Sequence, residues 1–298
     1  ASTATGIYIS DSRVISITNT VIEDYSRCFD FSSYSGTATI GPDILIRPGI
    51  NGTAIYTNNS SSSGKIILDG NVDIELNGAS ARGIHTASGR ADIELREGWS
   101  ITGRQQGRGI HLDSTNYTLS ASGGVIQNCE YGLYLDGGAS SSCTLTDVEI
   151  SGNQKDGIYA DPGSSNGGNL NILGHSQVSD NERSGIYVYT GKWTVKIDGA
   201  SIENNGLTGT SAYGGVYLSS SNIQSAEILN TLVSGNCSTT SGGGIYANAS
   251  VTLTNNTIAN NQVVRSRSSN EGSTAKGGGV YLSKASTLMG NTITGNTA

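Results

Sequence analysis

Aromatic side chains recur at one position of a short repeated step, and they are the residues of this chain best suited to binding chemistry. The step consists of Gly, an aliphatic residue and an aromatic residue, as in Gly157, Ile158 and Tyr159. Tyr and His rings combine a flat apolar face with a polar edge, which suits them to stacking on a sugar ring. The candidate binding residues are His85, His111, Tyr134, Tyr159, Tyr187, Tyr217, Tyr246 and Tyr281.

Two interpretations of these rings stay open at the level of sequence. If the aliphatic residue of each step points inward, alternation along a strand turns the aromatic residue outward. Every second ring would then lie about 10 Å from the next, near the repeat of an extended polysaccharide, which favours a glycan ligand. The alternative is structural, because aromatic residues favour strands and pack against their neighbours across a sheet.

Three aspartates follow the aromatic position by two residues in consecutive repeats. Asp113, Asp136 and Asp161 should therefore lie about 5 Å apart on one face, where like charges raise the pKa of at least one carboxyl group. Oxygen ligands in this pattern are typical of a Ca²⁺ site, and a carboxylate pair at this separation is typical of a glycosidase. Each Asp also ends a strand before Gly, Ser or Pro, so ordinary turn chemistry is the third interpretation.

His85 and His111 fall in neighbouring repeats and could seat a metal, although a simple replacement of Tyr in the column also explains them. Arg90, Arg104 and Arg108 lie near them in the sequence. Arg together with His could neutralise a uronate and accept its proton. These residues form no complete catalytic motif, so we assign no catalytic residue and expect a protein that is not an enzyme.

The chain contains four cysteines, Cys28, Cys129, Cys143 and Cys237. An even number suggests disulfides in a secreted chain, but four cysteines allow three connectivities. Cys129 and Cys143 fall in neighbouring repeats, so they are the pair we favour.

All these residues must be positioned by a repeated structure. The middle residue of the step, or its replacement, recurs at intervals of roughly 22 to 35 residues, which is within the range of solenoid repeats. Each interval holds two more short runs of period two, separated by Gly, Asn and Ser turns, and helical periodicity is absent. The recurring positions are 7, 29, 55, 84, 110, 133, 158, 186, 216, 245 and 280.

The repeat predicts an all-β fold, a right-handed parallel β-helix with about eleven coils and three short strands per coil. We expect a single domain over residues 1–298, less regular over 1–99 than over 100–298. An Asn recurs three residues after an aliphatic residue, as in Val178 and Asn181. Asn tolerates the left-handed conformation of a sharp corner, and stacked amides can bond one another along the axis.

These paired motifs resemble a known type of protein. An Asn that closes one strand and a Gly-aliphatic step that opens the next are similar to the coils of pectate-lyase-like β-helices. They also resemble the repeats of polymorphic outer-membrane proteins and autotransporter passengers, most closely over residues 150–159, 178–187 and 258–281. Those repeats favour Phe three residues before the Asn, where this chain has Ile or Val. The motifs of β-helical polygalacturonases and pectate lyases are absent.

Composition narrows the functions further. With 17 Lys and Arg against 24 Asp and Glu, the net charge is −7, which argues against nucleic acid as a partner. No apolar run is long enough for membrane insertion. The chain begins at Ala1 without a signal peptide, which is typical of a processed, secreted product. We therefore expect an extracellular or cell-surface location.

Together these patterns predict a non-enzymatic, extracellular structural or adhesive protein. Coils begin and finish close to both ends, so we expect self-association through the open solenoid ends, head to tail, into a fibre or surface layer. The alternative is a protein that binds or cleaves polysaccharide through its aromatic column, with a glycan as partner. No cofactor is expected apart from the Ca²⁺ considered above.

Overall fold

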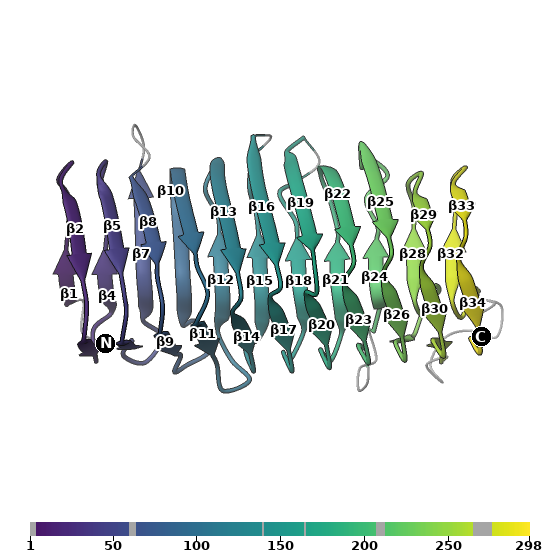
Figure 1. Cartoon of the computed structure of the whole chain (residues 1–298), viewed down its shortest axis with the longest axis horizontal. Helices are drawn as coiled ribbons and strands as arrows, with labels where there is room; N and C mark the ends of the chain where they lie inside the picture. The colour runs from purple at the N-terminus through teal and green to yellow at the C-terminus, as the bar shows by residue number, and fades with distance from the viewer. Residues whose placement is uncertain (1–3, 60–63, 139, 164, 207–211, 265–275) are drawn as a thin grey trace.

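The computed structural model describes residues 4–59, 64–138, 140–163, 165–206, 212–264 and 276–298. Throughout these ranges the regular structure consists of strands β1 to β34, and no helix is present. Figure 1 shows the coils side by side along the long axis of the molecule, with the two chain ends at opposite ends of the stack.

Three parallel sheets run the length of the stack, and each coil contributes to all three, although two of the sheets are joined through one long strand. We call them sheets A, B and C. The long strand β10 (Arg82–Leu95) takes part in both A and B. Sheet A also contains β1 (Thr5–Tyr8), β4 (Arg27–Asp30), β7 (Thr53–Asn59), β12 (Arg108–Leu112), β15 (Tyr131–Leu135), β18 (Asp156–Ala160), β21 (Ser184–Val188), β24 (Gly214–Leu218), β28 (Ile245–Ala247) and β32 (Val280–Leu282).

The other two sheets follow in the same order along the chain. Sheet B also contains β2 (Val14–Ile17), β5 (Thr37–Ile40), β8 (Lys65–Leu68), β13 (Asn116–Ser122), β16 (Ser141–Thr146), β19 (Gly167–Leu173), β22 (Lys192–Asp198), β25 (Ser225–Leu229), β29 (Thr252–Thr254) and β33 (Thr287–Met289). Sheet C contains β3 (Thr20–Glu23), β6 (Ile44–Arg47), β9 (Val72–Glu75), β11 (Trp99–Thr102), β14 (Val125–Gln127), β17 (Glu149–Ser151), β20 (Gln177–Ser179), β23 (Ser201–Glu203), β26 (Leu232–Ser234), β30 (Thr257–Ala259) and β34 (Thr292–Thr294). A further short pair is β27 (Cys237–Ser238) with β31 (Gln262–Val263).

The register of sheet A follows the repeated step. Ile110 pairs with Leu133, and Leu133 pairs with Ile158 of the next coil. The same pairing joins every recurring position from Ile7 to Val280. Sheet C has eleven strands. The predicted parallel β-helix, with eleven coils and three strands per coil, is therefore confirmed.

The core consists of the side chains that alternate toward the inside of the coils. In β22, Trp193, Val195 and Ile197 are buried, while Lys192 is exposed. Burial of each such apolar side chain contributes about 1.5–3 kcal/mol. Hydrogen bonds run from coil to coil, so each coil depends on its neighbours.

Stacked Asn side chains line one corner of the coils, as the sequence predicts. The Nδ2 of Asn181 donates to Oδ1 of Asn205 at 2.8 Å, and Asn205 donates likewise to Asn236 at 2.9 Å. The expectation that the recurring Asn is itself left-handed holds for Asn128, with a φ of 55°, but is wrong for Asn181, Asn205 and Asn236. The positive φ belongs to the preceding residue, 54° at Asn204 and 66° at Gly235. The ladder Asn instead turns its amide along the axis to bond the next coil.

Candidate functional site

The aromatic residues of the repeated step stack on the side of sheet A away from the core. Parallel pairing places Tyr159 beside Tyr187, and the rings follow one another at centroid distances of 4.2–5.5 Å. We call this column the aromatic ladder. Its members are Tyr56, His85, His111, Tyr134, Tyr159, Tyr187, Tyr217, Tyr246 and Tyr281. The rings therefore lie where the repeat predicts them, and their binding role stays a prediction.

The ladder is more covered than strand alternation alone predicts. His111 is only 4% exposed and Tyr187 only 6% exposed, whereas Tyr217, Tyr246 and Tyr281 remain partly exposed. Further tyrosines that are not part of the repeated step account for some of the cover. These are Tyr131, Tyr189 and Tyr213, which lie 4.7–6.3 Å from ladder rings.

Guanidinium groups also contact the ladder, and the sequence reasoning did not single out this arrangement. The Arg108 guanidinium lies 3.8 Å from the centroid of the Tyr134 ring, within the range of a cation–π interaction. Arg108 pairs in register with Arg82 on one side and Tyr131 on the other. Each of these residues stands directly before the Gly of its step. Residues directly before this Gly lie on the same face as the ladder and in the same register. Their identity could therefore have indicated the arginine contacts from sequence.

His85 and His111 stack face to face, with centroids 4.9 Å apart and ring planes 7° apart. The predicted neighbourhood of these two residues is thus correct. Burial is the main cause that lowers the pKa of each imidazole to about 3, with Arg82 next for His85 and Arg108 next for His111. Both rings are therefore neutral at pH 7, so they add polar edges to the ladder without adding charge.

Asp113, Asp136 and Asp161 follow the strands of sheet A in three successive coils. The backbone N–H of Asp136 donates to Leu112 of the preceding coil at 2.8 Å. Burial, followed by the charge of Asp161, raises the pKa of Asp136 to about 6. Asp161 accepts hydrogen bonds from Thr190 at 2.6 Å and from the Tyr159 hydroxyl at 3.2 Å. These contacts fit the turn interpretation for Asp161.

The Ca²⁺ prediction for these three aspartates finds no support in the geometry. Within the described ranges, no group of three or more His, Cys, Asp or Glu side chains is placed to hold a metal ion. One reason is that both carboxylate oxygens of Asp161 accept hydrogen bonds from hydroxyl groups, those of Thr190 and Tyr159. The arrangement presents carboxylate groups beside the aromatic ladder, and the Ca²⁺ site stays a prediction.

The predicted disulfide between Cys129 and Cys143 is wrong, because both are free thiols. Cys143 lies inside β16 of sheet B, in register with Leu119 and Leu170. Cys129 lies at the other side of the coil, at the corner between β14 and β15, where its N–H donates to Asn153. Neighbouring coils therefore do not bring the two sulfur atoms together. Burial raises the pKa of each thiol to about 12.

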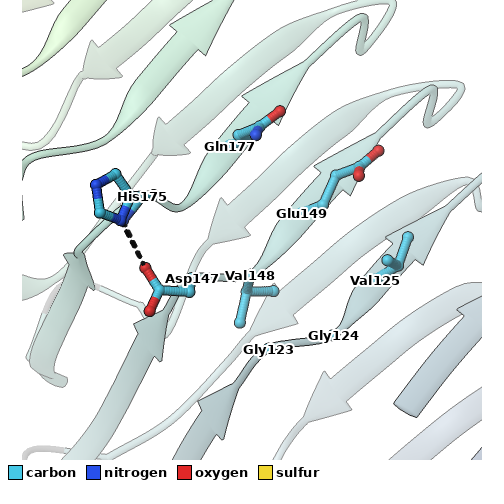
Figure 2. A pocket seen from close by; sticks show the side chains of 8 residues that line it. All are labelled: Gly123, Gly124, Val125, Asp147, Val148, Glu149, His175 and Gln177. Atoms are coloured by element: carbon cyan, nitrogen blue, oxygen red, sulfur yellow. Dashed lines mark hydrogen bonds and ion pairs between the residues drawn. The ribbon is translucent and has the colours of Figure 1, made fainter. Parts of the chain in front are cut away.

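A shallow pocket of about 220 Å³ lies away from the ladder, where sheet B turns into sheet C. Figure 2 shows His175 and Asp147 facing each other at its rim, with Nδ1 and Oδ1 3.4 Å apart. The backbone N–H of His175 also donates to Asp147 at 2.7 Å. The sequence did not indicate this pair. The His175 side chain is 97% exposed to solvent. The pocket is therefore open at this rim and would enclose little of a ligand.

Comparison with known proteins bears on the fold. Residues 131–298, more than half of the chain, match the family model described as the right-handed β-helix region. No curated protein and no solved structure matches the chain. No helix among the residues that the structure describes is long and apolar enough to cross a membrane. The likeness to autotransporter repeats stays a prediction. With its stacked parallel coils and this match, the chain belongs to the right-handed β-helix family.

Proposed function

We propose that the protein is a non-enzymatic, extracellular adhesive rod that binds an extended polysaccharide along its aromatic ladder. The observation that carries this proposal is the unbroken stack of rings from Tyr56 to Tyr281 on one face of sheet A. Partly exposed Tyr rings offer apolar faces for sugar stacking and hydroxyl groups for hydrogen bonds. The extracellular location is part of the proposal, because it is where such a polymer would be met.

The spacing of the ladder supports an extended polymer over a small ligand. Successive coils are about 4.8 Å apart, so alternate rings lie about 10 Å apart along the axis. Four pockets of about 210–280 Å³ among the described residues are shallow and open to solvent, so they enclose little of a small molecule. A long chain laid along the rod could instead contact several partly exposed rings at once, and many weak contacts then add up.

Binding to a panel of immobilised polysaccharides tests this proposal. Tyr217 and Tyr246 are the most closely stacked pair, with centroids 4.2 Å apart, and both are partly exposed. The double variant Tyr217→Ala/Tyr246→Ala should lose at least tenfold in affinity for the polymer that the native protein binds. Tyr25→Ala is the matched control, because Tyr25 is exposed but lies outside the ladder. Equal binding by both variants would contradict the proposal, and release of shortened chains would contradict its non-enzymatic part.

A structural role through self-association is the second candidate. The first and last described coils expose apolar side chains, among them Val14 and Val21 at one end and Met289 and Ile293 at the other. Such surfaces support the stacking of a second copy end to end. Sedimentation velocity at rising concentration tests this, with Met289→Ser/Ile293→Ser as the variant. Concentration-dependent growth that the variant abolishes is expected, and a single slow species at every concentration would rule it out.

A further inference from the structure

Two arginines occupy adjacent rungs beside the ladder. Arg82 of β10 and Arg108 of β12 are in register on neighbouring coils, so their backbones lie about 4.8 Å apart. Two like charges at this spacing repel each other. Burial, and after it the charge of Arg108, lowers the pKa of Arg82. Stacked guanidinium groups of this kind need a nearby negative charge to offset the repulsion.

Other arginines on this face already have that partner. Arg27 pairs with Asp30 at 2.7 Å, and Arg183 pairs with the fully buried Asp156. In contrast, neither Arg82 nor Arg108 forms an ion pair with any carboxylate among the residues described. The charge of Asp113 acts on both guanidinium groups and that of Asp136 acts on Arg108, but neither carboxylate accepts a hydrogen bond from these arginines.

His111 offers these two arginines only one acceptor nitrogen. Arg82 Nε lies 3.0 Å from Nδ1 of His111, and Arg108 Nη1 lies 3.3 Å from Nδ1 and 3.0 Å from Nε2. A guanidinium group can only donate, and a neutral imidazole has one acceptor nitrogen and one N–H. Nδ1 is the nitrogen that both arginines reach, so it serves as the acceptor, and the N–H then lies on Nε2, 3.5 Å from Oδ2 of Asp136. The two arginines therefore share a single acceptor, and protonation of His111 would remove it.

The remaining donors of this pair are unused as well. Both terminal nitrogens of Arg82, and Nε and Nη2 of Arg108, have no acceptor within the part of the chain that the structure describes. These groups border a pocket of about 220 Å³. Its lining consists of Ala79, Ser80, Ala81, Arg82, Arg108 and Glu130. The pocket has room for several water-sized groups, since one water takes about 30 Å³.

The only acidic side chain in this lining is already neutralised. Glu130 forms an ion pair with Lys155 at 2.6 Å. The charge that faces the pocket is therefore that of two guanidinium groups, whose planar forks match the oxygens of a carboxylate or sulfate. Arg108 also lies against the Tyr134 ring of the ladder, which joins the pocket to the proposed polymer track.

We propose that Arg82 and Arg108 form an oxyanion site that holds a carboxylate or sulfate group of the polysaccharide on the ladder. This inference rests on the proposed function and names its ligand class, an acidic glycan. The oxyanion supplies acceptors to the guanidinium N–H groups that His111 leaves unpaired, and it offsets the repulsion between the two arginines.

Small anions test the site without any polymer. Thermal unfolding is followed in sodium sulfate, sodium acetate and sodium chloride at equal ionic strength, for the native chain and for Arg82→Gln/Arg108→Gln. Relative to chloride, sulfate or acetate should raise the midpoint of the native chain by several degrees more than that of the variant, because exclusion of these salts from the surface stabilises both proteins alike. Without anions the variant should unfold at the same temperature as the native chain or higher, because the repulsion is gone. An equal response of both proteins to all three salts would overturn the inference.

Titration with polymers distinguishes a carboxylate ligand from a sulfate ligand. It also tests the oxyanion site separately from the adhesive function. Isothermal titration with alginate, dextran sulfate and uncharged dextran compares a carboxylated, a sulfated and a neutral chain. The variant should lose at least tenfold in affinity for one of the acidic polymers, whereas Arg47→Gln, on sheet C, should lose none. If small anions bind but no polymer does, the site stands and the adhesive function fails. If a polymer binds through Tyr217 and Tyr246 with no effect of Arg82→Gln/Arg108→Gln, the adhesive function stands and this inference fails.

Discussion

Arg183 reaches across one coil to Asp156 and closes a buried ion pair beneath the tyrosines of the ladder. The Nε of Arg183 lies 2.9 Å and 3.0 Å from the two carboxylate oxygens, and Nη2 contacts the second of them. Asp156 is fully buried, and burial raises its pKa although Arg183 opposes that shift. The guanidinium group also lies 5.5–5.9 Å from the centroids of four Tyr rings.

Removal of this cation should therefore be costly. Arg183→Met leaves the Asp156 carboxylate buried without its partner, and such a loss costs about 3–5 kcal/mol of unfolding free energy. Urea denaturation at pH 7 measures it. The double variant Asp156→Asn/Arg183→Met should recover part of the loss, because the buried charge is gone. Arg47→Met, which breaks exposed ion pairs, should cost less than about 1 kcal/mol. A similar cost for both arginines would contradict this account of the pair.

The Asn ladder should be the most sensitive polar feature of the corner. Asn205 donates to the Val178 carbonyl at 2.9 Å and bonds Asn181 and Asn236 on either side. Asn205→Ala leaves several buried groups unsatisfied, each worth about 1–3 kcal/mol, so a loss above about 2 kcal/mol is expected. The exposed Asn222→Ala is the control and should change stability by less than about 0.5 kcal/mol. Chemical denaturation compares the two, and equal stabilities would disprove the role of the ladder.

His85 and His111 should stay neutral at pH values where histidines normally titrate. Their pKa values are near 3 in the fold, against about 6.5 in the unfolded chain. Between these values the unfolded state binds more protons, so stability falls as pH decreases from 6.5 toward 3. NMR of the imidazole nitrogens should show no titration of either ring between pH 8 and pH 5, while both titrate in urea. A folded-state midpoint near 6.5 for either ring would refute the burial of the stack.

Asp136 should produce the opposite pH dependence. Its pKa rises from an ordinary value near 3.9 to about 6 in the fold. Between these values the folded state binds more protons, so this carboxyl group lowers stability progressively as pH rises through the window. Asp136→Asn should therefore be more stable than the native chain at pH 8, and the difference should vanish below pH 4. The exposed Asn222→Ala, which changes no titratable group, should shift stability equally at every pH. A constant difference for Asp136→Asn at all pH values would contradict the shift.

Much of the fold could be predicted because each coil repeats the same local rules. Alternation along a strand places Ile158 inward and Tyr159 outward, and one-coil spacing then stacks Tyr159 on Tyr134 and Tyr187. Both rules depend only on the backbone. The three aspartates after the strands were placed correctly for the same reason.

The missed features depend on packing between side chains of different coils. Arg183 bonds Asp156 and meets Tyr213 because three separate coils converge there, and no spacing within one repeat encodes that contact. Cys129 and Cys143 were paired by coil number alone, although their positions around the coil put them in different places. Residues that cover a repeated face can thus be found from sequence only by comparing the same position in neighbouring repeats.

Binding along the aromatic ladder predicts that affinity depends on the length of the sugar chain. Oligosaccharides from disaccharide to octasaccharide are prepared from the polymer that binds best, and their dissociation constants are measured by titration calorimetry. A ligand laid along the ladder contacts more rings as it lengthens, so affinity should rise with each added disaccharide. Tyr217→Ala/Tyr246→Ala should flatten that rise. Equal affinity for short and long chains, unchanged by the double variant, would contradict binding along the aromatic ladder.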